Sequence, residues 1–402
     1  MKSKKATTKP FHNAEIPGDW EVCKISDFGS VYTGNTPPTN EIENYGDEYL
    51  FVSPGDLGDG KYVLKTEKRL SKKGFDISRK FPKGTVLFTC IGSTIGKSGI
   101  AIVNLTSNQQ INAIVVNEKH DNEFLYYQLE KNAENIRLLA GEQAVPIINK
   151  SQFESVKLFS APLPEQKAIA QLLSTWDNAI TKTQALIAQK EQYKKWLMQN
   201  LLTGKKRLKG FENTKWKKVG AGELFESITK KGFEQEELLS ATQDRGIIPR
   251  NDLEGRVTMP QGTTAGYKLV EPGNFIISLR SFQGGLEYSY YRGIVSPAYI
   301  VLKPKEKIDD EFYKQYYKSY EFIGRLATAV IGIRDGKQIS YDDFCIVKIP
   351  FPSIKEQAAI TNVLQTADKE IQFLKKKMEK LKEQKKGLMQ GLLTGKKRLE
   401  IK

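Results

Sequence analysis

The chain has 402 residues, 39% of them hydrophobic and 10% aromatic, so it can fill the cores of two or more domains and is not a disordered chain. Its formal net charge of +15 indicates an acidic partner, most often nucleic acid and less often an anionic membrane surface, although solubility alone is a second explanation. Three cysteines and two histidines, all far apart, are too few for a disulfide framework or a zinc site.

Residues 1–16 form a basic N-terminal tail. No apolar segment follows it, so it does not have the pattern of a secretory signal. Nowhere does the chain contain the run of about 18 apolar residues that a membrane-spanning helix needs. We therefore expect a soluble cytoplasmic protein with no membrane partner.

The next region, residues 17–161, has the mixed signals of an α+β domain. It opens on a segment that contains Trp20. Residues 85–89 and 111–116 are rich in β-branched and aromatic side chains, which is typical of strands. One helix is expected near residues 122–140.

Residues 162–208 have the pattern of a long helix. Pro164 suits the first helical position, where a missing N–H costs nothing. Gly204 stands where a residue in the left-handed conformation would end the helix. A helix of about 38 residues would be roughly 57 Å long, at ~1.5 Å per residue.

Residues 209–351 repeat the first organisation with little sequence similarity. The region opens around Trp216, strand-like runs cover residues 274–279 and 298–302, and a helix is expected near residues 309–329. We therefore predict a second α+β domain, and in both domains a twisted, mostly antiparallel sheet.

Residues 352–402 repeat the first helical block. The segment Leu-Leu-Thr-Gly-Lys-Lys-Arg-Leu at 201–208 recurs without change at 392–399, which is 191 positions later. The pair Glu165-Gln166 recurs at the same offset as Glu356-Gln357. Ser353 and Glu356 fit a capping box, and Gly395 again stands at the helix end. The chain is therefore a tandem of two halves, each a globular region followed by a long helix.

Apolar residues recur in heptads along both helical blocks. Nine of ten heptad positions are apolar in the second block and seven of ten in the first. The matching seams predict that the two helices form an antiparallel coiled coil, and the alternative is that each helix packs only on its own domain. The predicted helix-pair interface comprises Ile169, Leu173, Trp176, Ile180, Ile187, Leu197, Ile360, Leu364, Ile371, Leu374, Met378, Leu381 and Leu388.

The turn at residues 92–98 is similar to a phosphate-binding loop but fails the pattern. Three residues separate its glycines, whereas four are needed for successive backbone N–H groups to surround a phosphate. The turn either presents Ser93, Thr94 and Lys97 to DNA or is purely structural. No pairing of histidine with cysteine, or of serine with histidine and aspartate, indicates a catalytic centre.

Side chains suited to DNA follow several of the strand-like segments. Arg, Asn and Gln match base edges in the major groove, and Lys matches phosphates. The alternative for any one of them is an ordinary solvated surface group. The candidate DNA-binding residues are Lys61, Ser93, Thr94, Lys97, Asn108, Gln109, Lys230, Lys231, Arg280, Ser281, Gln283 and Arg334.

This organisation resembles the specificity subunit of type I restriction-modification systems. The segments 162–170 and 352–360 and the two identical eight-residue segments carry the resemblance to its helical repeats. The turn at 91–97 and the opening Thr-Gly-Asn-Thr-Pro at 33–37 resemble its target-recognition domains. The second half has no clear copy of either, with Phe-Gln-Gly-Gly at 282–285 near the place of the former.

The resemblance implies a fold and a function. The fold would be two α+β target-recognition domains separated by two long helices that form an antiparallel coiled coil. Each domain would read one half of a bipartite, asymmetric site in double-stranded DNA. The helix pair would set the spacing and dock two methyltransferase (modification) subunits, which in turn recruit restriction (translocase-nuclease) subunits. This chain would be non-catalytic, with S-adenosylmethionine, ATP and Mg²⁺ bound by the partner subunits.

Two other functions remain open on the sequence. One is a basic coiled-coil scaffold that joins proteins without reading DNA. The other is a self-contained restriction-methylation enzyme, which would need a cofactor loop and a cluster of catalytic carboxylates.

Overall fold

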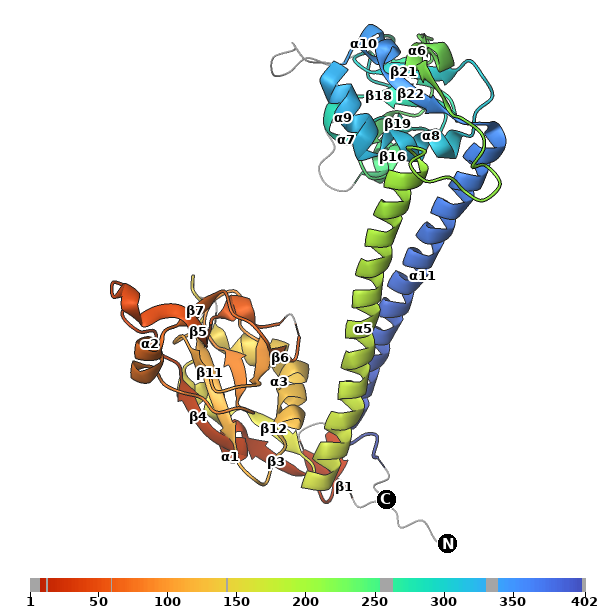
Figure 1. Cartoon of the computed structure of the whole chain (residues 1–402). Coiled ribbons are helices and arrows are strands. Elements are labelled where there is room, and N and C mark those ends of the chain that lie inside the picture. Colours follow the sequence, from red (N-terminus) through yellow and green to blue (C-terminus); the bar gives the residue numbers. More distant parts are fainter. Residues whose placement is uncertain are drawn as a thin grey trace. The chain divides into compact units, whose positions relative to one another are not determined.

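The structure, a computed structural model, describes residues 8–11, 14–58, 60–141, 144–253, 263–329 and 339–399 (Figure 1). Its internal contacts divide the chain into two compact units. Unit 1 contains residues 1–183 and 377–402, and unit 2 contains residues 184–376. Each unit therefore combines one α+β domain with one part of each long helix.

The main sheet of unit 1 has five strands. The neighbouring strands pair antiparallel except for β6 and β9, which pair parallel. The predicted strands at 85–89 and 111–116 are confirmed as β8 and β11. In spatial order the strands are β4 (Gly29–Thr33), β11 (Ile111–Val116), β8 (Val86–Thr89), β9 (Ser98–Ala101) and β6 (Tyr62–Val63).

Smaller sheets and short helices complete the domain of unit 1. A three-stranded sheet has the order β10 (Thr106–Ser107), β5 (Tyr45–Val52) and β7 (Lys68–Leu70), and two strand pairs join β1 (Thr8–Phe11) to β2 (Ala14–Pro17) and β3 (Glu21–Lys24) to β12 (Lys157–Ser160). The helices are α1 (Ile25–Phe28), α2 (Lys72–Ile77), α3 (Asn122–Arg137) and α4 (Lys150–Ser155), with short 3-10 turns η1 (Ile42–Asn44), η2 (Pro54–Asp56) and η3 (Leu138–Ala140). Helix α3 confirms the helix predicted near 122–140.

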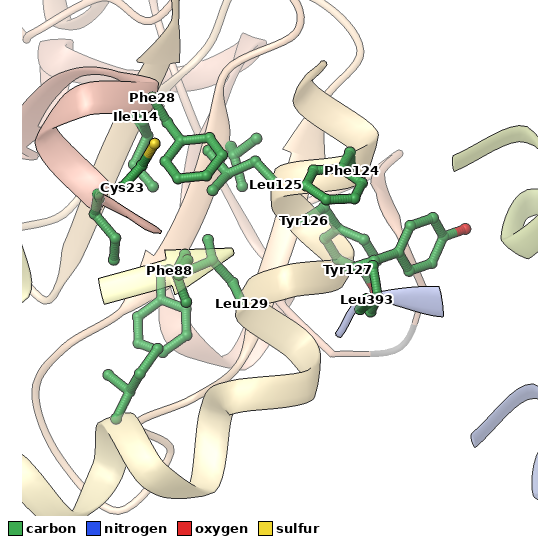
Figure 2. Close-up of a cluster of buried hydrophobic side chains, with 14 of the residues drawn as sticks. Cys23, Phe28, Phe88, Ile114, Phe124, Leu125, Tyr126, Tyr127, Leu129 and Leu393 are labelled. Atoms are coloured by element: carbon green, nitrogen blue, oxygen red, sulfur yellow. The ribbon is translucent and has the colours of Figure 1, made fainter. Parts of the chain in front are cut away.

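The core of unit 1 is built from distant parts of the chain. Helix α3 contributes Phe124 and Leu125, the sheet contributes Phe88, and all three are fully buried. The segment after the second long helix contributes Leu393, which lies beside the α3 side chains in Figure 2. Because Leu393 is completely buried, the domain core depends on the last residues of the chain.

Unit 2 has a smaller antiparallel sheet in which β18 and β21 confirm the predicted strands. Its order is β14 (Phe225–Ile228), β21 (Ile300–Pro304), β18 (Phe275–Ile277) and β19 (Glu287–Tyr288). Three further strand pairs join β13 (Lys217–Gly220) to β22 (Lys348–Phe351), β15 (Leu239–Thr242) to β16 (Gly246–Pro249) and β17 (Lys268–Val270) to β20 (Gly293–Val295). The shorter helices are α6 (Ala221–Leu224), α7 (Ser281–Gly284), α8 (Asp310–Tyr317), α9 (Tyr320–Ala329), α10 (Tyr341–Ile346) and the 3-10 turn η4 (Arg250–Asp252).

The single helix predicted near 309–329 is two helices. Helix α8 ends at Tyr317, and the hydroxyl of Ser319 accepts a hydrogen bond from the backbone N–H of Phe322 at 3.2 Å. A serine in that position starts a new helix, because it satisfies an N–H that has no partner inside the helix. The spacing of apolar residues continues from α8 into α9, so the spacing alone does not show that one helix ends and another begins.

The long helices α5 (Leu163–Leu201) and α11 (Ile354–Leu392) each have 39 residues. Within unit 2, Lys194 pairs with Asp368 at 2.6 Å and Glu191 pairs with Lys375 at 2.7 Å. Residue numbers therefore rise along α5 as they fall along α11, which confirms antiparallel packing. Within unit 1, Lys385 pairs with Asp177 at 2.8 Å, which repeats the Lys194–Asp368 pair at the offset of 191.

Candidate nucleic-acid interface

Three loops of unit 1 meet at one edge of its five-stranded sheet. Strand pairing places Thr33 opposite Asn112, Ile111 opposite Thr89, and Phe88 opposite Ser98. The end of β4, the turn between β8 and β9, and the start of β11 therefore lie at the same edge. We call this surface, formed by residues 34–41, 90–97 and 108–110, the first loop edge.

Polar side chains connect the loops of the first loop edge. The hydroxyl of Thr36 donates to Oε1 of Gln109 at 2.6 Å, which joins loop 34–41 to loop 108–110, and within the latter loop the amide of Asn108 donates to Oε1 of Gln110 at 3.0 Å. A Cβ atom at Gly34 would lie 2.2 Å from the carbonyl oxygen of Asn108, so only glycine lets the two loops approach this closely. The amide and hydroxyl groups at this edge are thus held in a defined arrangement.

Arg79 lies at the same edge, and the sequence did not identify it. Its backbone N–H donates to Oδ1 of Asn35 at 2.7 Å, and its guanidinium donates to the carbonyl of Thr33 at 2.5 Å. The guanidinium carbon is 5.9 Å from the centre of the Tyr32 ring. Among the described residues no carboxylate forms an ion pair with Arg79. Its side chain is exposed and retains donors for a phosphate or a base edge.

The turn at 92–98 uses its backbone N–H groups inside the protein. Ile95 donates to Gly92 at 3.3 Å, Gly96 donates to Thr89 at 3.2 Å, and Lys97 donates to Thr94 at 3.2 Å. These groups are therefore not free to surround a phosphate. Among the side chains of this turn that we proposed for DNA binding, Ser93 is exposed, while Thr94 and Lys97 are half-buried.

Lys61 lies in the interior of unit 1, away from solvent. Its side chain is 5% exposed, and its Nζ donates to Oε2 of Glu123 at 2.8 Å and to the hydroxyls of Tyr127 and Ser174. Burial alone would raise the pKa of Glu123, but hydrogen bonds from Lys61, Ser174 and Tyr62 outweigh that effect and hold its pKa below the ordinary value. Lys61 therefore joins the domain to α5, and the structure does not support a phosphate contact for it.

Unit 2 has an equivalent surface. Strand pairing places Ile228 opposite Val301 and Ile277 opposite Ile300. The segments that follow β14 and β18, and the one that precedes β21, therefore lie at one edge of the sheet. We call residues 229–233, 278–286 and 296–299 the second loop edge.

The second loop edge carries most of the residues predicted for this half. Lys230, Lys231, Arg280 and Gln283 are exposed there, and Lys230 pairs with Glu271 at 3.0 Å. Ser281 is different, because it is 1% exposed and its hydroxyl accepts a hydrogen bond from the N–H of Ser278 at 2.9 Å. Ser281 therefore stabilises the turn, and the structure does not support a base contact for it. Arg334 lies outside the described residues.

The loop at 278–286 follows β18 just as the turn at 90–97 follows β8. The two loops occupy equivalent places between equivalent strands, although their sequences are not similar. The framework of the sheet is thus repeated in the two units, while the side chains at its edge differ.

The predicted helix-pair residues are distributed over both units. The structure buries eight of them and leaves five half-buried. The buried ones are Ile169, Leu173, Ile187, Leu197, Ile360, Leu364, Ile371 and Leu374, and the half-buried ones are Trp176, Ile180, Met378, Leu381 and Leu388. Many also pack into the domain cores, so each helix has both helix and domain neighbours.

The repeated Glu-Gln and Lys-Lys-Arg segments explain how each domain is attached to the helices. In unit 1 the buried carboxylate of Glu165 accepts two hydrogen bonds from Arg398, at 2.7 and 2.8 Å, and one from the indole of Trp20 at 3.0 Å. In unit 2 Glu356 accepts the corresponding bonds from Arg207, at 2.6 and 2.7 Å, and from the indole of Trp216 at 2.9 Å. We call each arrangement a Glu–Arg–Trp cluster.

The neighbouring glutamines are also equivalent. Gln166 accepts from the backbone N–H of Asp121 at 2.8 Å, and Gln357 accepts from that of Asp309 at 2.8 Å. Both aspartates cap the helix that follows them. The repeated residues thus position a domain helix against a long helix.

The capping box predicted at the start of α11 is half correct. The hydroxyl of Ser353 accepts from the N–H of Glu356 at 3.4 Å. The carboxylate of Glu356 does not return to Ser353 but binds Arg207 and Trp216. A buried carboxylate gains more from a guanidinium than from a backbone N–H, because a charged donor forms the stronger hydrogen bond.

Among the described residues, no three His, Cys, Asp or Glu side chains are close enough together to hold a metal ion. The same part of the chain contains no helix that is both long and apolar enough to span a bilayer.

Comparisons with known proteins agree with this geometry. The chain is 27% identical over 431 residues to the type I restriction enzyme MjaVIII specificity subunit of Methanocaldococcus jannaschii, covering 99% of this chain and 97% of the relative. The crystal structure of the type I restriction-modification S subunit from M. genitalium has a TM-score of 0.55 at 18% identity, covering 98% of this chain and 100% of that chain. The HsdS subunit from Thermoanaerobacter tengcongensis gives a TM-score of 0.56 at 18% identity, covering 96% and 99%.

The family described as type I restriction modification DNA specificity domain matches the chain twice. The matches cover residues 17–191 and 213–383, which together contain both sheets, both loop edges and most of both long helices. The chain therefore belongs to the family of type I restriction-modification DNA specificity subunits.

Proposed function

We propose that this chain directs a type I restriction-modification complex to a bipartite, asymmetric DNA site, with one loop edge reading each half. It acts as the non-catalytic subunit of the complex, as its family does. Residues 17–161 and 209–351 form the two target-recognition domains, and 162–208 and 352–402 form the helical repeats.

The observation that carries this proposal is the pair of loop edges on equivalent sheets. The first loop edge presents Asn35 and Gln109, with Arg79 bonded beside them, and the second presents Lys231 and Arg280. These side chains are suited to base edges and phosphates, and they differ between the two edges. Two different recognition surfaces imply two different half-sites. The net charge of +15 supports DNA as the ligand.

The antiparallel helix pair supports the remaining parts of the proposal. It would set the distance between the half-sites and dock two modification subunits, through which the restriction subunits join. S-adenosylmethionine, ATP and Mg²⁺ would be bound by those partners.

The test is to exchange residues 17–161 for the corresponding domain of another family member and map the methylated sites. We expect one half of the site to change and the other half to stay the same, because each half is read by a separate sheet edge. Movement of both halves together would contradict the proposal.

A point substitution tests the first loop edge itself. Arg79→Ala should relax sequence preference in one half-site only, since a good side-chain contact to a base contributes about 1–3 kcal/mol of discrimination. Arg69→Ala is the matched control, because Arg69 is also exposed but belongs to β7 and donates to the carbonyl of Glu48 at 2.9 Å.

The alternative of a protein scaffold predicts a different result. A scaffold that is basic only for solubility would show no salt-dependent DNA binding in a gel shift, with or without the modification subunit. A DNA-binding subunit loses affinity steeply as salt rises, because phosphate contacts release counterions.

A further inference from the structure

The turn between β15 and β16, residues 243–245, lies beside the second loop edge without being one of its three segments. The bridge between Ile247 and Ser289 is parallel, so β16 begins at the same end of the sheet as β19. Strand β19 pairs antiparallel with β18, and it therefore begins where β18 ends, at the second loop edge. The turn that leads into β16 lies at this edge too. A direct contact agrees, because a Cβ atom at Gly284 would be 3.1 Å from Cγ of Gln243.

The turn presents three successive polar side chains that can read DNA. Gln243, Asp244 and Arg245 are all exposed. In the major groove an amide can bond adenine, a carboxylate can accept from cytosine, and a guanidinium can bond guanine. Arg245 uses one N–H on the carbonyl of Asp252, at 3.3 Å, and keeps its remaining donors. The turn thus has the chemistry of a recognition segment, at the place where the other recognition segments of this domain meet.

Lys318 connects this turn to the loop that follows β18. It comes directly after α8, and its Nζ donates to the carbonyl of Gln243 at 3.2 Å and to the carbonyl of Gly284 at 3.0 Å. The end of α8 lies close to the same loop, since a Cβ atom at Gly285 would be 1.8 Å from the carbonyl oxygen of Tyr317. One ammonium group therefore holds the backbones of two exposed segments together.

A buried carboxylate fixes the position of the Lys318 ammonium group. Glu287, the first residue of β19, has a side chain that is 2% exposed, and its Oε1 accepts a hydrogen bond from Lys318 at 2.7 Å. Its Oε2 is buried and has no hydrogen-bond partner in the described part of the chain. Burial raises the pKa of Glu287 above its ordinary value, and the hydrogen bond from Lys318 opposes this shift. Lys318 is thus the counter-ion of Glu287, which in turn holds Lys318 against the two carbonyls.

This arrangement matters for reading because a base contact tolerates little displacement. A side chain in a binding site must be held within roughly 0.5 Å of its productive position by the contacts behind it. The carbonyls bound by Lys318 belong to Gln243 itself and to the loop that carries Arg280 and Gln283. Loss of the ammonium group would release both segments at once.

We propose that the turn at 243–245 is a further specificity-determining segment for the second half-site, and that Lys318 is the positioning residue that holds it against the loop at 278–286. Lys318 acts through the backbones of these two segments and does not itself contact a base. This inference rests on the proposed function. It adds a recognition segment that lies outside the three segments of the second loop edge.

The experiment uses the full-length chain in complex with its modification subunit and measures methylation of DNA duplexes. One duplex carries the site that methylation mapping finds for the wild type, and the others carry single base changes in one half-site or the other. Lys318→Met should lower discrimination at the second half-site by about tenfold, which is the scale of one good base contact. Discrimination at the first half-site should stay within about twofold of wild type, because separate sheet edges read the two halves.

Two further variants separate positioning from reading. Gln243→Ala should relax only a subset of the base positions that Lys318→Met relaxes, because it removes one side chain and leaves both backbones in place. Lys318→Arg should restore discrimination to within about twofold of wild type, since a guanidinium also offers several donors to the same acceptors. Failure of Lys318→Arg to restore what Lys318→Met loses would contradict the positioning role.

Lys305→Met is the matched control. The Nζ of Lys305 also donates to a backbone carbonyl, that of Gly222 at 2.6 Å. Lys305 follows the end of β21, however, so it lies at the opposite edge of the sheet from the second loop edge. Its loss should leave discrimination at both half-sites within about twofold of wild type.

The remaining outcomes distinguish this inference from the proposed function. If Lys318→Met lowered the melting temperature and slowed methylation of every duplex by the same factor, Lys318 would be purely structural and the inference would be wrong. Full discrimination in Gln243→Ala, Asp244→Ala and Arg245→Ala would show that the turn does not read DNA. A wild-type complex without any preference at the second half-site would overturn the proposed function as well.

Discussion

Two glycines end the long helices in a conformation that other residues adopt at a cost. Gly204 and Gly395 both have φ of +71°. A Cβ atom at Gly395 would also lie 2.4 Å from Cδ of Pro17, within unit 1. The glycine therefore serves both the left-handed turn and the close approach of the N-terminal segment.

Gly395→Ala should destabilise unit 1 by at least about 1–2 kcal/mol, because a left-handed residue with a Cβ costs roughly that amount before any clash. Gly387→Ala is the control, since Gly387 is exposed in the interior of α11 and a Cβ atom added there would meet no other atom within 4 Å. That change should stabilise the protein by about 0.5–1 kcal/mol. Thermal unfolding measures both, and shifts of the same sign would contradict the argument.

The Glu–Arg–Trp cluster of unit 1 gives a second prediction. The side chain of Glu165 is 2% exposed, so removal of Arg398 would leave a buried carboxylate without its counter-ion. Loss of one partner of such a pair costs about 3–5 kcal/mol, and we expect the lower end of that range for Arg398→Ala because Arg398 is partly exposed.

Hydrogen exchange locates this effect. Arg398→Ala should accelerate exchange in unit 1 and leave unit 2 unchanged, because the cluster of unit 2 uses Arg207 instead. The neighbouring Lys397→Ala, an exposed surface change, should stay within about 0.5 kcal/mol of wild type. Equal acceleration in both units would show that the cluster does not act locally.

At the scale of elements, the long helices and the central strands were predictable, and the smaller elements were not. Strands β8 and β11 have the β-branched composition that the rules of strand formation require. Strand β6 has only two residues, and its pairing with β9 depends on tertiary contacts. Short strands of this kind have no periodicity that a sequence pattern can detect.

The structure explains why lysines interrupt the apolar heptad seams. Lys194 and Lys385 occupy positions where an apolar residue was expected, and each forms an ion pair with an aspartate of the other long helix. A heptad pattern treats such residues as defects, whereas in the structure each lysine has a partner on the facing helix, and we expect these pairs to favour one alignment of the helices.

A double-mutant cycle tests this alignment in unit 2. Lys194→Asp and Asp368→Lys should each destabilise unit 2, and the double variant should recover part of the loss, because the reversed charges attract again. We expect a coupling energy of about 0.5–1 kcal/mol, measured by denaturant unfolding. Lys195→Asp combined with Asp368→Lys is the control and should show no coupling, since Lys195 points to solvent.

At the scale of the whole molecule, the sequence identified the architecture but only part of each recognition surface. Gln109 and Asn108 lie close to the strand predicted at 111–116, and the sequence already made them candidates for DNA binding. Arg79 reaches the same edge from an irregular segment, through bonds to Thr33 and Asn35 that are more than forty positions away. Folding alone brings Arg79 next to Thr33 and Asn35. Lys61 and Ser281 differ from the exposed candidates only in being buried, which a sequence does not show.

The spacing role of the helix pair can be tested by lengthening both helices. Insertion of one heptad in α5 and one at the equivalent place in α11 keeps the apolar seams aligned and adds about 10 Å, at ~1.5 Å per residue. The gap between the half-sites should widen by up to about three base pairs, given roughly 34–36 Å per turn of 10–10.5 base pairs. Methylation mapping measures the gap, and an unchanged gap would contradict the spacing role.

The division of the chain into units also affects its synthesis on the ribosome. Unit 2 is one continuous segment of the chain, so all of its residues are available for folding once residue 376 has left the ribosome. Unit 1 begins first but lacks residues 377–402, including the buried Leu393, until the whole of unit 2 has been synthesised. At ~5–20 residues per second, the N-terminal domain waits about 10–40 s for its final segment. During that interval its apolar core is incomplete, so the nascent chain is a natural client for a chaperone.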